Sequence, residues 1–538
     1  MFFRKIKTLF SNPFFSIFIF VIAACNRLFV QVYYFTFGSD RSLQILSAKN
    51  FMNGHGITIN QVMPADVAKE IYLPLTGWPP GYSIGVGITS FVTQQPVIIG
   101  SILFDLACVL LLLFYSRKIL LHLNCSVAVV NFYTFVYGFF IYDFLRSSTS
   151  DLNAMAFFIC SFSLCLNFIK NNKKGNAYAV AIATVGFLSA FIRYMFIPIA
   201  FVIPLYLIFF GKISGNKRIL NGGLLATIAT LIFIIALLIF QNQYTGAAAY
   251  INETTKGFYP GNLAQFYSVI FASFINTGFY YSVANSVSLL QYGEHAQILR
   301  LINFLIGCGL FVWLLKYFSI KKWRSVSLPD HFLFVGSITS VITIAMLAML
   351  SLLYAPFILE DYTWTFVREA RYFALPLVFL QLLFFVFIFQ KWETLQSKFL
   401  KAVAIILFFF INLETLHGIY FTGKLLVNDK TVFHQNKQFI EQKIFIENLT
   451  LHLKENNPLH QIIFTSTDAT YISLASINGA KGLYGLSNNT QLASSQPFIL
   501  IIMLKEAELK KFTTLLASTE AKLFKTIGNL HFFEYRYK

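Results

Sequence analysis

The stretch GSDRSLQILSAKNFMNGHG, residues 38–56, follows the first long apolar run of the chain and places an acid, Asp40, next to that run. Ser39 can cap a short helix that begins at Asp40 and ends near Gly54, because a serine oxygen accepts hydrogen bonds from the free N–H groups of a first helical turn. Asp40 would then lie in that first turn, where the helix dipole favours a carboxylate. The stretch therefore predicts a short polar helix with an acid at its start, at the boundary of an apolar segment.

The composition around this stretch is that of an integral membrane protein. Hydrophobic residues make up 57% of the 538 residues, charged residues make up 12%, and the mean hydropathy is +0.65, whereas soluble domains carry roughly 25% charged residues. The apolar runs are longer than barrel strands and do not alternate, so they predict helices, which satisfy every backbone group inside lipid. The net charge of +18 needs no nucleic acid partner, since the basic residues are spread over loops and the tail.

The apolar runs predict an all-α polytopic membrane bundle of about eleven transmembrane helices. The run 177–210 is too long for one span and contains Arg193 followed by Pro198, so we expect two short helices joined by a tight turn. The segment 263–284 is nearly long enough to span, but its polar residues and tyrosines favour a re-entrant or interfacial helix. The expected spans are 14–36, 96–120, 126–144, 151–169, 177–192, 196–210, 219–240, 298–318, 331–355, 371–390 and 399–418.

The distribution of Lys and Arg predicts the orientation of this bundle. Loops on the side of the N-terminus, such as the one with Lys170, Lys173 and Lys174, hold most of the basic residues, and such loops face the cytoplasm. We therefore expect a multi-pass protein of a cell (inner) membrane with a cytoplasmic N-terminus and an extracytoplasmic C-terminus. The two large outer loops are then 38–95 and 241–297.

The segment 425–538 differs in composition from the rest. Helical stretches alternate there with short apolar strands, QIIFTS and PFILIIML, and the last two strands are predicted to form a hairpin around Gly528 and Asn529. The chain is thus expected to consist of a membrane module, residues 1–424, and a small extracytoplasmic α/β domain, residues 425–538. A role of this domain in acceptor recognition and a role as a scaffold are both open.

Four stretches, in this order, resemble the GT-C superfamily of membrane glycosyltransferases, especially the branch of protein mannosyltransferases and aminoarabinose transferases. The first is the acid after the first span, with NGHG ending the short helix and WPPGY leading into the next one. The family's first loop often has a second acid beside the first, and here Arg41 stands in that place. The other stretches are SSTSDLNAMAFFICSFSLCLNFIKNN (147–172), GFLSAFIRYMFIPIAFVIPL (186–205) and VREARYFALPLVFL (367–380).

The resemblance implies an enzyme that moves a sugar from a polyprenyl phosphate carrier to a lipid, glycan or protein acceptor at the outer face of the membrane, with inversion. Asp40 matches the family's catalytic aspartate, which would accept the proton of the acceptor or hold a divalent metal ion. Because Arg41 replaces the second acid, the metal requirement is open. Arg193, Arg371 and Tyr372 are candidates for binding the donor phosphate, since a guanidinium binds a phosphate through two parallel hydrogen bonds. The alternative is arginines that reach the lipid headgroups beside interfacial tyrosines.

Four further polar residues are candidates for positioning the acceptor or a cation: Asp151, His55, Glu294 and His295. An acid at a helix start is commonly only a cap, and no HxxxH spacing supports a metal site. Lys49 and Arg41 are expected to face lipid phosphates or solvent.

Two other classes of protein have a comparable number of spans. A flippase or transporter of lipid or sugar would contain an internal repeat or a chain of buried acids, and the sequence predicts neither. A surface polysaccharide ligase or polymerase would concentrate basic residues in a large late outer loop, whereas the loop 356–370 is short. The glycosyltransferase is favoured because the distinctive polar residues lie in the first outer loop.

Overall fold

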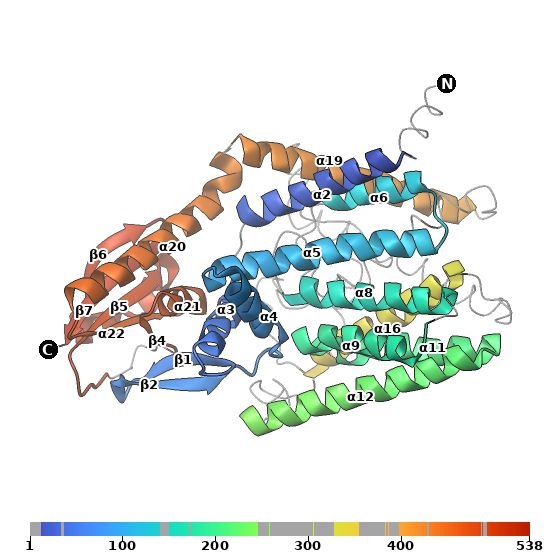
Figure 1. The fold of residues 1–538 in the computed structure, drawn as a ribbon. Coiled ribbons are helices and arrows are strands. Elements are labelled where there is room, and N and C mark those ends of the chain that lie inside the picture. The colour runs from blue at the N-terminus through green and yellow to red at the C-terminus, as the bar shows by residue number, and fades with distance from the viewer. Residues whose placement is uncertain are drawn as a thin grey trace. The chain divides into compact units, whose positions relative to one another are not determined.

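The computed structural model describes residues 12–33, 37–139, 150–171, 174–245, 328–353, 398–427, 430–485 and 492–537, together with a few isolated positions. The chain divides into two compact units (Figure 1). The helical unit comprises residues 1–32, 105–243 and 247–423. The mixed unit comprises residues 33–104, 244–246 and 424–538.

Every predicted span that falls on described residues is helical. The helices are α2 (Pro13–Tyr33), α5 (Val97–His122), α6 (Val127–Phe139), α8 (Ser150–Lys170), α9 (Asn176–Ile192), α10 (Ile197–Ala200), α11 (Val202–Ser214), α12 (Lys217–Thr245), α16 (Leu328–Leu353) and α19 (Lys398–Leu426). Within the described residues, six helices are long and apolar enough to cross a membrane. The count of eleven stays a prediction, since 298–318, 371–390 and the re-entrant segment 263–284 lie outside the described residues apart from isolated positions.

Small and polar residues bring the helices of the helical unit together. The Ser161 hydroxyl of α8 donates a hydrogen bond to the Ile182 carbonyl of α9 at 2.8 Å, and Gly186 of α9 lies against the same serine. Small residues let helix backbones approach closely where lipid supplies no hydrophobic driving force. Arg27, buried inside α2, donates to the Tyr137 carbonyl at 3.0 Å, near the end of α6. An arginine inside a span is costly in lipid, and this carbonyl gives it a partner.

The first outer loop folds differently from the prediction. Helix α3 (Ser39–Met52) is followed by an antiparallel hairpin of β1 (Thr58–Met63) and β2 (Asp66–Pro74), and then by α4 (Gly81–Thr93). The sequence analysis missed the hairpin, because TINQVM and DVAKEIYLP show little regular alternation of apolar and polar residues. Only the short stretch between the end of β2 and Gly81 is irregular in this part of the loop, because α4 already begins at Gly81 with Pro80 as its N-cap.

The tail folds into a five-stranded sheet in the order β4-β3-β5-β7-β6, covered by helices. The predicted strands are confirmed as β3 (Gln461–Ser466), β5 (Phe498–Lys505), β6 (Lys522–Ile527) and β7 (Leu530–Tyr537), and the last two pair as the predicted hairpin. Gly528 takes a positive φ of 61° in its turn, which a residue without Cβ adopts freely. The helical elements are α20 (Lys430–Asn456), α21 (Ala469–Ile477), η6 (Glu506–Lys511) and α22 (Thr513–Ser518), and the missed strand is β4 (Lys481–Leu483).

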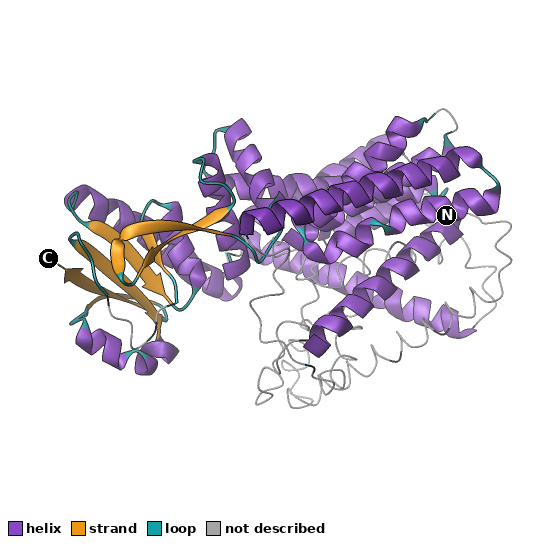
Figure 2. Ribbon diagram, turned by 90° about the horizontal axis from the view of Figure 1, so that it is seen from below, coloured by secondary structure: helices purple, strands orange, loops and turns teal. Residues whose placement is uncertain are grey.

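The hairpin of the first loop and the tail sheet share one hydrophobic core. The Val67 amide donates to the Ala493 carbonyl and the Ala493 amide donates to the Pro64 carbonyl, both at 3.0 Å. Strand β1 also contacts the edge strand β4, and Figure 2 shows the hairpin reaching the sheet. Segments 38–95 and 425–538 therefore belong to one compact unit. The core residues are Val62, Val67, Ile463, Leu483, Phe498, Leu500, Ile502, Leu504, Phe512 and Leu515.

Candidate functional site

Asp40 lies in the first turn of α3, as predicted, and its side chain is partly exposed. The predicted cap is wrong by one residue: Gly38 is the N-cap, in extended conformation and without a side-chain hydrogen bond, and Ser39 is already helical. The Ser42 amide donates to the Gly38 carbonyl at 2.9 Å. The dipole of α3 therefore acts on the Asp40 carboxylate, because the other N–H groups of this turn point out of the helix end.

The two basic residues of α3 do not face lipid or solvent as expected. Arg41 is 3% exposed, and its Nη2 donates to the Ser101 hydroxyl at 3.2 Å. Lys49 is half-buried, and its Nζ donates to the Ser476 carbonyl of α21 at 2.9 Å. Both expectations were wrong because the polar side of α3 is covered by protein. Helix α3 is thus anchored by a basic side chain near each end.

His55 lies at the end of α3 opposite to Asp40, roughly 20 Å away along the helix axis at about 1.5 Å per residue. Its exposed ring stacks on the Tyr72 ring of β2, with centroids 4.0 Å apart and planes inclined by 15°. Gly54 and Gly56, with φ of 83° and 71°, make the turn that places this ring. The structure therefore does not bring His55 beside Asp40. Its role in positioning acceptor or cation stays a prediction.

Asp151 and Arg193, two predicted site residues, form an ion pair in the helical unit. Arg193 Nε is 2.8 Å from Asp151 Oδ1, and the two side chains are 12% and 3% exposed. Arg193 Nη1 also donates to the Ser150 hydroxyl at 3.4 Å. Asp151 Oδ2 makes no hydrogen bond to a described residue. The guanidinium is therefore held on one side, which leaves its other N–H groups to bind a further acceptor.

The pair forms because the helix breaks at Arg193, as the sequence predicted. Helix α9 ends at Ile192, Arg193 has an extended backbone, and a short 3₁₀ turn, η1 (Tyr194–Phe196), leads into α10 with Pro198 in its first turn. Pro198 fits there because the first turn of a helix has no use for its missing N–H. Asp151 lies in the first turn of α8. Two features therefore stabilise the Asp151 carboxylate: the positive end of the α8 dipole and the Arg193 guanidinium at the helix break.

Asp105 is a buried acid that the sequence analysis did not select. It lies inside α5, is fully buried, and accepts hydrogen bonds from Asn153 Nδ2 at 3.1 Å and Gln31 Nε2 at 3.5 Å. The signal was present, since an acid inside an apolar span is costly and suggests a role. Amide partners satisfy this carboxylate, and Asn153 is a near neighbour of Asp151 on α8.

The other predicted site residues, Glu294, His295, Arg371 and Tyr372, lie outside the described residues. Asp40 belongs to the mixed unit, whereas Asp151 and Arg193 belong to the helical unit. In the part of the chain that the structure describes, no three His, Cys, Asp or Glu side chains are grouped as metal ligands. The divalent metal ion therefore stays a prediction.

No protein-family model matches the sequence, and no curated protein sequence matches it either. Solved structures do match. ArnT from Cupriavidus metallidurans in the apo state is 12% identical, with 96% of this chain and 97% of that chain covered and a TM-score of 0.54. The same protein bound to undecaprenyl phosphate is 12% identical, with 97% and 98% covered and a TM-score of 0.46. The Archaeoglobus fulgidus oligosaccharyltransferase tethered with an acceptor peptide is 12% identical, with 94% and 70% covered and a TM-score of 0.47.

The chain has the fold of ArnT. Of the three matches, only the one with a TM-score of 0.54 is high enough to carry this assignment. That superposition covers nearly the whole of both chains. This likeness of fold agrees with the resemblance that the order of the sequence stretches suggested. At 12% identity the likeness concerns the fold, and function has to be argued from the side chains.

Proposed function

We propose that the chain is a glycosyltransferase of the GT-C type, embedded in a membrane. It takes a sugar from a polyprenyl-phosphate carrier and transfers it to a lipid, glycan or protein acceptor at the outer face, with inversion of the anomeric centre. The observation that carries the proposal is the partly exposed Asp40 in the first turn of α3, in a chain with the fold of ArnT. The family resemblance of the sequence supplies the donor and acceptor classes.

Asp40 acts as the general base in this proposal. The acceptor oxygen attacks the anomeric carbon from the face opposite to the phosphate, and its proton passes to the Asp40 carboxylate. A new carbon–oxygen bond forms as the bond between the anomeric carbon and the phosphate oxygen breaks, and polyprenyl phosphate leaves with the bonding electrons. A carboxylate accepts the proton late in such a transition state.

The leaving phosphate requires positive charge that is held in place. Arg193 supports this role because its ion pair with Asp151 fixes the guanidinium, while other N–H groups have no partner among the described residues and could bind a phosphate. Arg371 and Tyr372 remain proposed donor ligands on the family resemblance alone. Asp151 is then a residue that orients Arg193. Positioning of an acceptor or cation by His55, Glu294 or His295 remains a further proposal.

The membrane and its sides are part of the proposal. The excess of Lys and Arg in the loops on the side of the N-terminus supports a cytoplasmic N-terminus in a cell (inner) membrane. The first outer loop, with Asp40, and the tail domain then lie on the extracytoplasmic side. Polyprenyl phosphate presents its phosphate at headgroup depth, which is where a helix start directly after a span would place Asp40.

Sugar transfer by the purified protein in lipid, supplied with a panel of radiolabelled polyprenyl-phosphate sugars, tests the proposal. Asp40→Asn preserves the shape of the side chain and removes the base, so transfer should fall by about 10²- to 10⁴-fold. Glu506→Gln, at an exposed acid in the first turn of η6, is the matched control and should retain transfer. Absence of transfer from every donor of the panel would refute the assignment. Transfer that survives in Asp40→Asn would refute it as well. Lipid flux that persists without Asp40 would instead favour a flippase.

A further inference from the structure

Helix α3 is a mostly buried helix with many polar side chains. Its buried residues include Ile45, Leu46 and Ala48, which are fully inaccessible, and also Arg41 and Asn50, which donate hydrogen bonds outside the helix. It packs on α21, α4 and β1. Buried polar side chains need matched partners, and these partners fix one arrangement of a helix more narrowly than apolar contacts do. The position of α3 is therefore set by specific hydrogen bonds.

The contact between Lys49 and Ser476 is the longest-range of these bonds. Lys49 Nζ donates to the Ser476 carbonyl at 2.9 Å, across 427 residues of sequence. Ser476 lies in the last turn of α21, where carbonyl groups carry the negative end of the helix dipole and attract an ammonium group. Burial lowers the pKa of Lys49, and Lys454 lowers it further, against the opposing effect of Glu70. Burial thus disfavours the charged form of the Lys49 amine, and the hydrogen bond to the Ser476 carbonyl holds the amine in this position.

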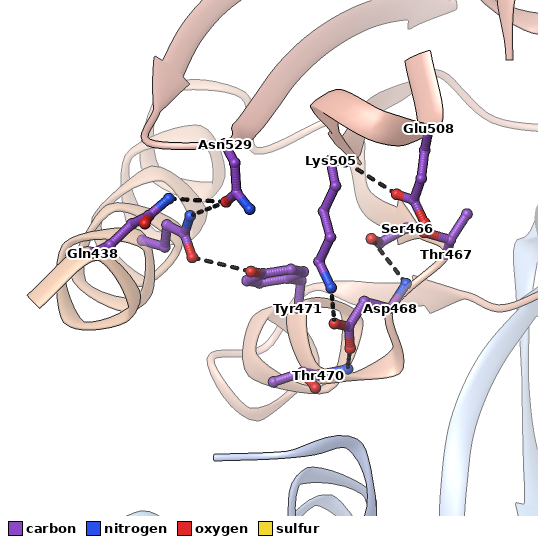
Figure 3. A network of polar contacts seen from close by, with 10 residues as sticks. Gln438, Ser466, Thr467, Asp468, Thr470, Tyr471, Lys505, Glu508 and Asn529 are labelled. Atoms are coloured by element: carbon purple, nitrogen blue, oxygen red, sulfur yellow. Dashed lines mark hydrogen bonds and ion pairs between the residues drawn. The ribbon is translucent and has the colours of Figure 1, made fainter. Parts of the chain in front are cut away.

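Helix α21 is a firm support because its other end is tied to the sheet (Figure 3). Asp468 caps α21 by accepting from the Thr470 amide at 2.9 Å, and it pairs with Lys505 Nζ of β5 at 2.8 Å. Tyr471 donates its hydroxyl hydrogen to Gln442 Oε1 of α20 at 3.0 Å. Lys49 therefore connects α3 to a helix that cannot shift without breaking contacts to the sheet and to α20.

The hairpin forms a second connection between α3 and the tail. Asn50 Nδ2, next to Lys49, donates to the Thr58 carbonyl of β1 at 2.9 Å. Lys481 Nζ of β4 donates to the Ala68 carbonyl of β2 at 2.9 Å, and the hairpin valines enter the tail core. The α3 residues of these contacts, Lys49 and Asn50, lie in the half of the helix opposite to Asp40. The tail therefore determines where this half lies, and a rigid helix transmits that position to its first turn.

We propose that Lys49 is a positioning residue, which fixes α3 on the end of α21 and so holds Asp40 in place. The tail domain then supports α3, the helix that bears Asp40. The catalytic consequence rests on the proposed function, whereas the mechanical part does not. Lys49 lies nine residues from Asp40, or about 13 Å along the axis at ~1.5 Å per residue, so it acts through α3 and not on the reacting atoms.

The test replaces the amine and keeps the aliphatic part of the side chain. In Lys49→Met, amide hydrogen exchange of residues 39–52 should rise about 10-fold, as expected for the loss of one charged hydrogen bond. The kcat for sugar transfer should fall about 10- to 100-fold, since displacements of about 1 Å have such effects, while KM for the donor stays unchanged. Lys49→Arg, which can still donate to the carbonyl, should restore the exchange pattern and part of kcat.

Lys522→Met, on the exposed edge strand β6, is the matched control and should alter neither exchange of α3 nor kcat. Unchanged exchange and unchanged kcat in Lys49→Met would overturn the proposal, and a rise in KM alone would place Lys49 at the donor. If Lys49→Met does not accumulate as folded protein, Lys49→Gln, with a shorter donor, gives the same comparison. If the wild type transfers no sugar, the proposed function fails, while the exchange data still decide whether Lys49 holds α3.

Discussion

Truncation of Val67 to alanine tests whether the first outer loop and the tail fold as one unit. Val67 is on β2 and fully buried in the core that the hairpin shares with β5. Removing two methyl groups loses about 1.6 kcal/mol of transfer free energy at ~0.8 kcal/mol per group. The cavity left behind adds about 1 kcal/mol, at ~24 cal/mol per Å³ for roughly 50 Å³. The expected loss is therefore about 2–3 kcal/mol.

Hydrogen exchange of the tail strand is the measurement that reports this loss. Because 1.4 kcal/mol corresponds to a factor of ten, amides of Phe498–Lys505 in β5 should exchange about 30- to 150-fold faster in Val67→Ala. Met63→Ala, at an exposed position of the same hairpin, should change exchange by no more than a few-fold, as surface substitutions cost about 0.5 kcal/mol or less. Faster exchange confined to β1 and β2, with β5 unaffected, would refute the shared core.

Two further predictions concern charges. Burial raises the pKa of Asp468, but hydrogen bonds from Lys505 and Thr470 outweigh the effect of burial and hold the pKa below its ordinary value of 3.8. The stability that the ionised Asp468 contributes is therefore present above pH 3.8 and is lost as the pH falls through the lowered pKa. Acid unfolding of the tail, followed by exchange of α21, should therefore steepen below about pH 4 in the wild type and not in Asp468→Asn, and parallel curves would contradict this. Arg193→Gln leaves Asp151 buried without its cation and should cost about 3–5 kcal/mol, seen as a lower thermal unfolding temperature in detergent. Arg193→Gln with Asp151→Asn should recover most of that loss, and additive losses would show that the two residues are not coupled.

The arrangement explains why the position of Asp40 was predictable while its support was not. A capping position, an acid in a first turn and a Gly-flanked helix end are recognised from neighbouring residues. The bounds of α3 were therefore predicted to within a few residues. Its burial depends on α4, α21 and β1, which are distant in the chain or were not recognised. The same reason explains the wrong expectation for Arg41, because Ser101, which it contacts, lies 60 residues away.

The sequence by itself determined the membrane class, the positions of the described spans, the break at Arg193 and four of the five strands of the tail sheet. These follow from the lengths of apolar runs, from proline and glycine, and from alternation, all of which act over a few residues. Tertiary structure alone decided that Asp151 pairs with Arg193, that Asp105 is held by Asn153 and Gln31, and that Lys49 binds the end of α21. Hydrogen bonds and ion pairs depend on side chains that meet only after the chain has folded, so their partners cannot be read from local pattern.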